Sequence, residues 1–132
     1  MAETRVVRPK RISFINWGAV DQGACRLRAG DRRVKPLLLR VWMAALGWCN
    51  CIGHAEFGKD QLSRILMCED ANGEKRQPSR QQVKAAIDRL VEMGLLEAGS
   101  GVRCLMPTKS IFEKASGASK VCYWHGRAPQ RR

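Results

Sequence analysis

The apolar positions of the chain recur at helical spacing in three separate segments. The first is "VKPLLLRVWMAALGWCN", where the spacing predicts a helix over 34–49 and Pro36 suits its first turn. Its apolar face is formed by Leu38, Val41, Trp42, Ala45, Leu46 and Cys49. This segment is the most apolar of the three, so we expect it to be the central core helix, with Cys49 as a buried structural thiol.

The second segment predicts a shorter helix over 59–67, marked by Leu62, Ile65 and Leu66. Asp60 suits the positive N-terminus of that helix. The preceding "HAEF" is typical of a short strand before a turn at Gly58. The following "EDANGEKRQPS" combines Asn-Gly, several charges and a proline, and predicts a loop.

The third segment begins with a helix start signal. Ser79 suits the N-cap, and Gln82 stands at the capping-box position three residues later. The residues Val83, Ala86, Ile87 and Leu90 form the apolar stripe, and Gly94 is typical of a helix end. Beyond it, "LLEA" and "VRCLM" flank "GSG" and predict a β-hairpin that Pro107 closes.

The flanks show no sustained period. Residues 1–33 predict a partly ordered basic arm, in which "DQGACRLRAGDRR" indicates a loop and Phe14 and Trp17 rest on the domain. Residues 108–132 predict a basic tail with one short helical turn around 111–114. The folded domain is therefore expected over 34–107.

The order of predicted elements is helix, short strand, helix, loop, helix and two-stranded hairpin. With "HAEFGKDQLSRIL" and "PSRQQVKAAIDRLVEMGLLEAGSG", this order resembles the winged helix-turn-helix domain, in the style of small proteins of phages, plasmids and other mobile elements. The resemblance implies an α+β, mainly α fold of three helices plus a short β-hairpin wing. The loop of about 11 residues before Ser79 departs from the few residues of a compact helix-turn-helix.

Charge adds a partner to this picture. The chain holds 24 Lys and Arg against 12 Asp and Glu, a net charge of +12. Residues 1–40 carry a net +7, residues 41–98 a net −1 and residues 99–132 a net +6. A near-neutral centre between basic flanks favours a polyanion, so nucleic acid is the expected partner, and the resemblance implies that it is double-stranded DNA. The lack of a secretory signal and of a long apolar run predicts a cytoplasmic, nucleoid-associated protein without a membrane partner.

The resemblance implies that the helix starting at Ser79 enters the major groove, where Arg, Lys and Gln can read base edges. The candidate DNA-binding residues fall into four groups. They are Arg80, Gln81, Lys84, Ala85 and Arg89 on the helix; Ser100 and Arg103 at the wing; Lys75 and Arg76 in the loop; and Arg8, Lys10 and Arg11, with Arg5, in the arm. Gln82 is expected to close the helix start instead.

The six cysteines are expected to stay reduced, and no cofactor is expected. A zinc site remains the alternative, with ligands drawn from Cys49, Cys51, His54, Cys122 and His125. Their spacing matches no standard zinc motif. No nucleophile–base pair, paired acidic motif or phosphate-binding loop is present, so an enzyme is not expected.

The leading hypothesis is a sequence-specific transcription regulator that binds a two-fold DNA site as a homodimer. One alternative is a replication-initiation or recombination accessory protein that binds repeated sites. Another is a winged-helix protein-interaction module, with Tyr123 and Trp124 of the tail as anchors for a protein partner.

Overall fold

Helices dominate residues 19–112, the part of the chain that the computed structural model describes. The elements in this range are α1 (Gln22–Ala29), α2 (Leu37–Trp48), β1 (Ala55–Glu56), α3 (Gln61–Ile65), β2 (Cys68–Glu69), β3 (Lys75–Arg76), α4 (Arg80–Glu92) and β4 (Cys104–Leu105). The architecture is α+β and mainly α, as the sequence predicts. Between residues 19 and 112, no helix is long and apolar enough to cross a membrane.

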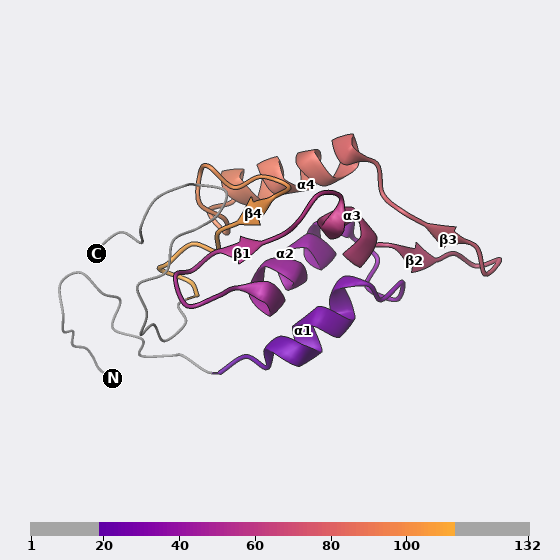
Figure 1. Cartoon of the computed structure of the whole chain (residues 1–132), viewed down its shortest axis with the longest axis horizontal. Coiled ribbons are helices and arrows are strands. Elements are labelled where there is room, and N and C mark those ends of the chain that lie inside the picture. The colour runs from indigo at the N-terminus through magenta and orange to yellow at the C-terminus, as the bar shows by residue number, and fades with distance from the viewer. Residues whose placement is uncertain (1–18, 113–132) are drawn as a thin grey trace.

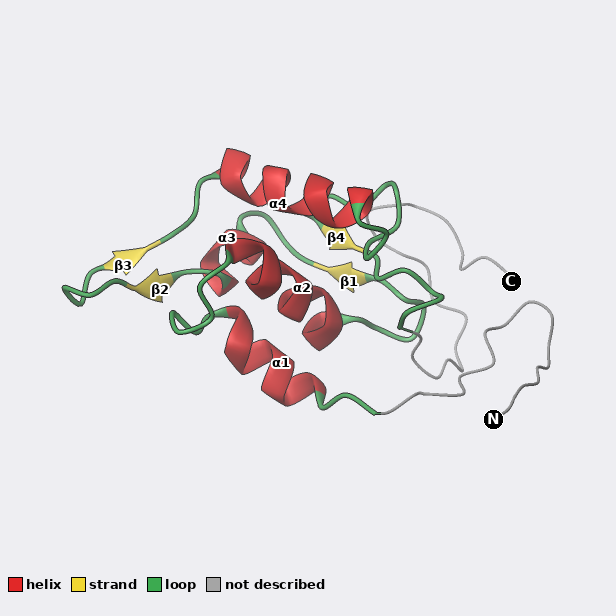
Figure 2. Ribbon diagram, turned by 180° about the vertical axis from the view of Figure 1, so that it is seen from behind, coloured by secondary structure: helices red, strands yellow, loops and turns green. Residues whose placement is uncertain are grey.

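The helices are arranged in layers around α2. Helix α2 lies between α1 on one side and α4 on the other, and both views show this order (Figures 1 and 2). Strands β1 and β4 lie beside α2 and α4, whereas β2 and β3 form a hairpin that extends beyond the ends of the helices (Figure 1). Each outer helix therefore has one face on α2 and one face toward solvent.

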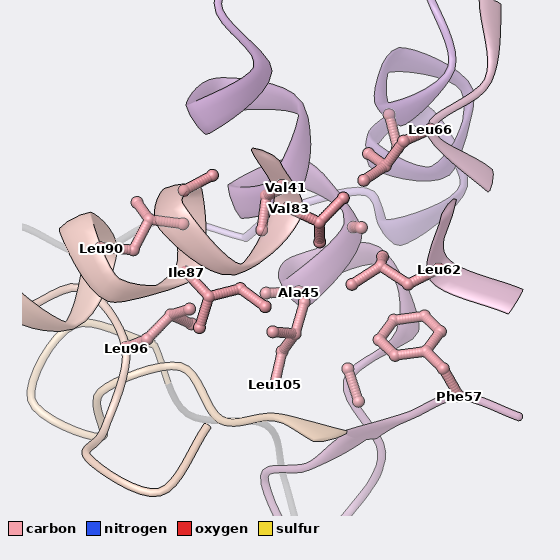
Figure 3. Packing of buried hydrophobic residues seen from close by; sticks show 14 residues of the cluster. Val41, Ala45, Phe57, Leu62, Leu66, Val83, Ile87, Leu90, Leu96 and Leu105 are labelled. Carbon is pink, nitrogen blue, oxygen red and sulfur yellow. The ribbon is translucent and has the colours of Figure 1, made fainter. Parts of the chain in front are cut away.

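The core confirms the two strongest apolar stripes of the sequence. Figure 3 shows Val83, Ile87 and Leu90 of α4 directed toward Val41 and Ala45 of α2. All five are at most 2% exposed. The side chains of Leu38 and Trp42 are partly buried and pack against the same cluster. Burial of these two stripes is what fixes α4 on α2.

Two helices are shorter than predicted. Helix α2 begins at Leu37, and Pro36 is its N-cap rather than a residue of its first turn. Helix α3 covers Gln61–Ile65 within the predicted 59–67. Asp60 precedes α3 with a positive φ of 59°, and its side chain caps no backbone group of α3. The expected favourable interaction of the Asp60 charge with the helix N-terminus therefore stays a prediction.

The loop predicted over 21–33 is wrong, because residues Gln22–Ala29 form helix α1. The carboxylate of Asp21 caps the helix by accepting hydrogen bonds from the backbone N–H groups of Gly23 and Ala24 at 2.9 and 3.2 Å. Only Cys25 and Ala29 of the helix are buried, so the apolar period was too sparse to indicate a helix.

Polar side chains of α1 tie it to the C-terminal end of α2. Gln22 donates from Nε2 to the carbonyl oxygens of Leu46 and Cys49 at 2.8 and 3.0 Å. Arg26 donates from Nε to the carbonyl oxygen of Gly47 at 2.7 Å. A Cβ at Gly47 would lie 2.9 Å from Cγ of Arg26, so this close approach requires glycine. The carbonyls that end α2 thereby gain partners.

The loop predicted over 69–79 is also partly wrong, because it contains the β2–β3 hairpin. Cys68 pairs with Arg76 and Glu69 with Lys75 in antiparallel register. The carboxylate of Asp70 accepts hydrogen bonds from the N–H groups of Asn72 and Glu74 at 2.9 and 3.0 Å, and Gly73 adopts a φ of 82°. Asn-Gly is a strong hairpin signal, but here it lacks flanking apolar alternation.

The hairpin predicted around "GSG" is confirmed in part. Strand β4 pairs mainly with β1, with Ala55 opposite Leu105 and Glu56 opposite Cys104. On the other side of β4, Leu96 and Pro107 form an isolated antiparallel bridge. The N–H of Glu97 also donates to the carbonyl oxygen of Met106 at 2.7 Å, so the two predicted strands do lie side by side, whereas the longer-range pairing of β4 with β1 was not predicted.

One charged side chain, Arg40 of α2, is buried at 9% exposure. Its Nη1 donates to the carbonyl oxygen of Leu66 at 2.6 Å and lies 3.5 Å from that of Ala29. These carbonyls belong to the C-terminal ends of α3 and α1, where the partial charge of a helix is negative. Arg40 therefore links three helices at one point.

Candidate nucleic-acid interface

Helix α4 starts with the predicted capping box. The hydroxyl of Ser79 accepts a hydrogen bond from the N–H of Gln82 at 3.1 Å. In return, Oε1 of Gln82 accepts one from the N–H of Ser79 at 2.9 Å. The local role predicted for Gln82 is thus confirmed, and its side chain is engaged in closing the helix start.

The predicted base-reading residues share the solvent face of α4. Arg80, Gln81, Lys84 and Ala85 are all exposed, as is Arg89 one turn further on. They lie opposite the buried stripe of the same helix. The first turn of α4 contains no acidic residue, so its exposed face begins with cationic and amide groups only.

Two acidic residues further along α4 partner its cations. Nζ of Lys84 lies 3.2 Å from Oδ2 of Asp88, and Nε of Arg89 lies 3.9 Å from Oε1 of Glu92. All four side chains are more than 60% exposed, so solvent and salt screen these pairs. Such pairs exchange readily for a phosphate or a base edge.

The candidates of the former loop region lie on β3, immediately before α4. Both Lys75 and Arg76 are exposed. Nε of Arg76 lies 2.8 Å from Oδ2 of Asp70. This hydrogen bond, with backbone hydrogen bonds from Glu74 and Asn72, holds the pKa of the Asp70 carboxyl below its usual value. Arg76 is therefore already engaged within the hairpin by Asp70, whereas Lys75 is an exposed cation on the same strand.

The wing candidates Ser100 and Arg103 are both half-buried. The hydroxyl of Ser100 accepts a hydrogen bond from the N–H of Met106 at 3.0 Å, which holds the turn. The backbone carbonyl of Arg103 accepts one from the N–H of Phe57 at 2.9 Å, which extends the β1–β4 pairing. Both residues thus contribute to the sheet side of the domain.

Several predicted residues lie outside the described residues. They are Arg5, Arg8, Lys10, Arg11, Phe14 and Trp17 of the arm, and Cys122, Tyr123, Trp124 and His125 of the tail. The DNA-binding candidates of α4 lie together on one exposed face, whereas DNA contact by the arm stays a prediction.

The described cysteine and histidine candidates, Cys49, Cys51 and His54, come shortly before β1 in the chain. Cys49 is buried, as predicted, whereas Cys51 and His54 are half-buried. Within residues 19–112, no three His, Cys, Asp or Glu side chains are grouped so that they could hold a metal ion. A contact that the sequence did not predict joins Sγ of Cys104 to Nδ1 of His54 at 3.3 Å. Only the β1–β4 pairing, itself not predicted, could have indicated it.

The connection between α1 and α2 contains Asp31, whose carboxyl has a pKa well below its ordinary value. Oδ1 and Oδ2 of Asp31 accept hydrogen bonds from Nε and Nη2 of Arg33 at 3.0 and 2.8 Å. These bonds lower the pKa of Asp31 from 3.8 to about 2. The stabilisation that this carboxylate gives is present above about pH 3.8 and is lost as the pH falls through about 2.

Replacing Arg33 with glutamine is expected to raise the pKa of Asp31 toward 3.8, because the bidentate partner is removed. The measurement is a carboxyl chemical-shift titration of Asp31 by NMR. The matched control is Arg28→Gln, since Nη1 of Arg28 lies 3.9 Å from Oδ2 of Asp31 and contributes less. An equal shift in both variants would contradict the hydrogen-bond explanation.

Comparisons of the chain with protein-family models, with curated proteins and with solved structures found no match. The residues and their geometry alone therefore carry the functional argument.

Proposed function

We propose that the protein binds double-stranded DNA in a sequence-specific way, with α4 in the major groove, and that it regulates transcription. The observation that carries this proposal is the division of α4 into two faces. One face is anchored in the core by Val83, Ile87 and Leu90, and the other presents Arg80, Gln81 and Lys84 to solvent. A rigidly mounted helix with base-reading groups near its N-terminus suits major-groove recognition.

The arrangement of elements supports a winged helix-turn-helix domain. Helix α4 lies on the outside of the layered body, where a duplex could reach its exposed face (Figures 1 and 2). Strand β4 pairs with β1, and Pro107, two residues after β4, forms a bridge with Leu96, which follows α4. The segment after α4 therefore folds back beside β1. Helix α1 and the β2–β3 hairpin are additions to the three-helix plan.

Each exposed residue of α4 has a role that its chemistry supports. Arg80 and Lys84 can donate to guanine, Gln81 can pair with adenine, and Ala85 can contact a thymine methyl group. Arg89 lies further from the N-terminus and suits a phosphate. The net charge of +12 supplies attraction that does not depend on sequence. The pair of Lys84 with Asp88 is exposed, so breaking it costs little.

The experiment that tests the proposal is a selection of bound sequences from random duplex DNA, using the full chain. Enrichment of a defined site supports sequence readout, and a two-fold symmetric site supports a homodimer. Tandem direct repeats would instead favour a replication or recombination role. Binding without any enriched sequence would overturn specific recognition.

Replacing Arg80 or Gln81 with alanine is expected to reduce discrimination at particular base pairs of the selected site by about 1–3 kcal/mol.

Replacing Arg89 with alanine is expected to weaken binding to all sequences and to lower the slope of log K against log salt by about 0.9. Fluorescence anisotropy with the selected site and its single-base variants measures both effects.

The matched control is Arg28→Ala. Arg28 is an exposed arginine on α1, on the far side of α2 from α4, so this variant removes the same charge from the opposite layer (Figure 1). It is expected to keep the base preferences unchanged. If Arg28→Ala and Arg80→Ala affected all sequences alike, α4 would not be the reading helix.

A further inference from the structure

The connection between α1 and α2 contains a hydrogen-bonded basic turn, residues 32–35. Its three cations, Arg32, Arg33 and Lys35, are all exposed. Just before them, the carboxylate of Asp31 accepts hydrogen bonds from the backbone N–H of Arg33 at 2.9 Å and from its guanidinium at 2.8 and 3.0 Å. These bonds fix the backbone of the basic turn, so its cations are held at one place on the surface.

The basic turn presents a positive surface to solvent. The side chain of Asp31 is only 13% exposed, whereas that of its partner Arg33 is 79% exposed. Among residues 19–112, neither Arg32 nor Lys35 forms an ion pair. An anion that approaches this turn therefore meets guanidinium and ammonium groups, while the nearby carboxylate is largely covered.

The basic turn, the β2–β3 hairpin and the start of α4 lie at the same end of the molecule (Figures 1 and 2). Nη1 of Arg32 lies 3.5 Å from the carbonyl oxygen of Asp70, which joins the turn to the hairpin, and Arg80 begins α4. Residues 68–76 of the hairpin carry a net charge of −1. The positive groups thus lie on either side of the hairpin, on the basic turn and on α4.

The spacing of the helices places the basic turn outside the groove that α4 would occupy. Helix α2 packs between α1 and α4, and packed helix axes are about 8–10 Å apart. The end of α1 is therefore up to about 16–20 Å from α4, whereas the major groove is about 12 Å wide. Beyond the groove edge a duplex presents phosphates to the protein, so the basic turn would meet phosphates and not base edges.

We propose that the basic turn is a second, sequence-independent DNA contact, in which Arg32 and Lys35 bind phosphates beside the site that α4 reads. This inference rests on the proposed function, because it takes the duplex to lie along α4. Arginine and lysine both bind phosphate through charged N–H donors. Such contacts fix the register and orientation of a protein on a duplex without reading its sequence.

Arg32→Gln and Lys35→Gln test the contact in the full chain. The probe is a duplex with the selected site and long flanks, and fluorescence anisotropy is measured at several salt concentrations. Each variant is expected to weaken binding to all sequences alike and to lower the slope of log K against log salt by about 0.9. Both side chains are exposed, so both variants are expected to fold, which circular dichroism checks. An unchanged slope in both variants would overturn the inference.

The matched control is Lys109→Gln, which removes the same charge elsewhere. The backbone N–H of Lys109 donates to Oε2 of Glu97 at 3.3 Å, in the segment that follows α4. Among residues 19–112 its side chain forms no ion pair. Lys109→Gln is expected to keep the slope of the unmodified protein. An equal loss in Lys35→Gln and Lys109→Gln would show an effect of net charge alone and would contradict a contact at the basic turn.

Hydroxyl-radical footprinting separates this inference from reading by α4. The unmodified protein is expected to protect backbone beyond the base pairs whose preference changes in Arg80→Ala. A double variant, Arg32→Gln with Lys35→Gln, is expected to lose only that flanking protection.

The outcomes for the two proposals differ. Unchanged flanking protection in the double variant would overturn the contact at the basic turn and leave reading by α4 intact. If Arg80→Ala and Gln81→Ala changed no base preference while the double variant still lowered the salt slope, reading by α4 would fail and the basic turn would stand. A protein that binds no duplex would overturn both.

Discussion

Replacing Phe57 with alanine is expected to lower the free energy of unfolding by about 3–5 kcal/mol. Phe57 follows β1 and is 1% exposed. Its ring lies close to Leu62 of α3 in Figure 3, and its centroid is 6.2 Å from that of Trp48 at an interplanar angle of 59°. Truncation would open a cavity where α2, α3 and β1 meet, and urea unfolding followed by circular dichroism measures the loss.

Two variants separate the cavity from other effects. Phe57→Leu keeps most of the apolar volume and is expected to cost clearly less than alanine. Leu27→Ala removes a side chain that is 71% exposed on α1, and it is expected to change stability by about 0.5 kcal/mol or less. A similar loss for Phe57→Ala and Leu27→Ala would contradict the position of Phe57 in the core.

Replacing Arg40 with alanine is expected to lower the free energy of unfolding by about 2–4 kcal/mol. The carbonyl of Leu66 would lose its 2.6 Å hydrogen bond, and the buried methylene groups of the arginine would lose their packing. A carbonyl left unsatisfied in the interior costs about 1–3 kcal/mol by itself. Thermal and urea unfolding of the variant measure the total.

Conservative variants divide this cost. Arg40→Met keeps an apolar stem of similar length and removes only the donors, so it is expected to be less destabilising than alanine. Arg40→Lys keeps one cationic donor near the carbonyls that end α3 and α1 and is expected to be the mildest. Nε of Arg40 is buried without a hydrogen-bond partner in residues 19–112, and this cost offsets part of the gain from the hydrogen bond to Leu66. If the Arg40→Met variant were as stable as the unmodified protein, that hydrogen bond would make no net contribution to stability.

The sequence predicted best where a full apolar stripe coincides with local end signals. Helix α4 has both, since Val83, Ile87 and Leu90 define its period and Ser79 with Gln82 defines its start. Helix α2 was predicted from its period and from Pro36 as a residue of the first turn, but it begins at Leu37 because Pro36 adopts an extended conformation. The buried face of α2 follows from the spacing of its apolar residues, whereas its ends depend on contacts with other segments.

Helix α1, which the sequence missed, depends on tertiary contacts. Helix α1 buries only Cys25 and Ala29, and side-chain hydrogen bonds of Gln22 and Arg26 to the end of α2 hold it in place. No local period can indicate such bonds. Asp21 belongs to the residue types that favour the N-cap, so it could have indicated the start of α1.

The same reason applies to the candidate sites. The exposed face of α4 could be predicted, because it is the complement of the buried stripe on one helix. The contact of His54 with Cys104 could not, because 50 residues separate them in sequence and the pairing of β1 with β4 brings them together.

The pairing of β1 with β4 also has a consequence for the newly made chain. Ala55 forms a bridge with the nearby Cys49, but it acquires its strand partner Leu105 only when that residue has left the ribosome, after α1, α2 and α3 have been synthesised. Until then the edge of β1 that faces β4 has no strand beside it, and the side chains that α4 and β4 later cover stay open to solvent. Synthesis of β4 therefore sets the earliest moment at which residues 19–112 can complete this core, and a chain stalled before β4 would be prone to aggregate.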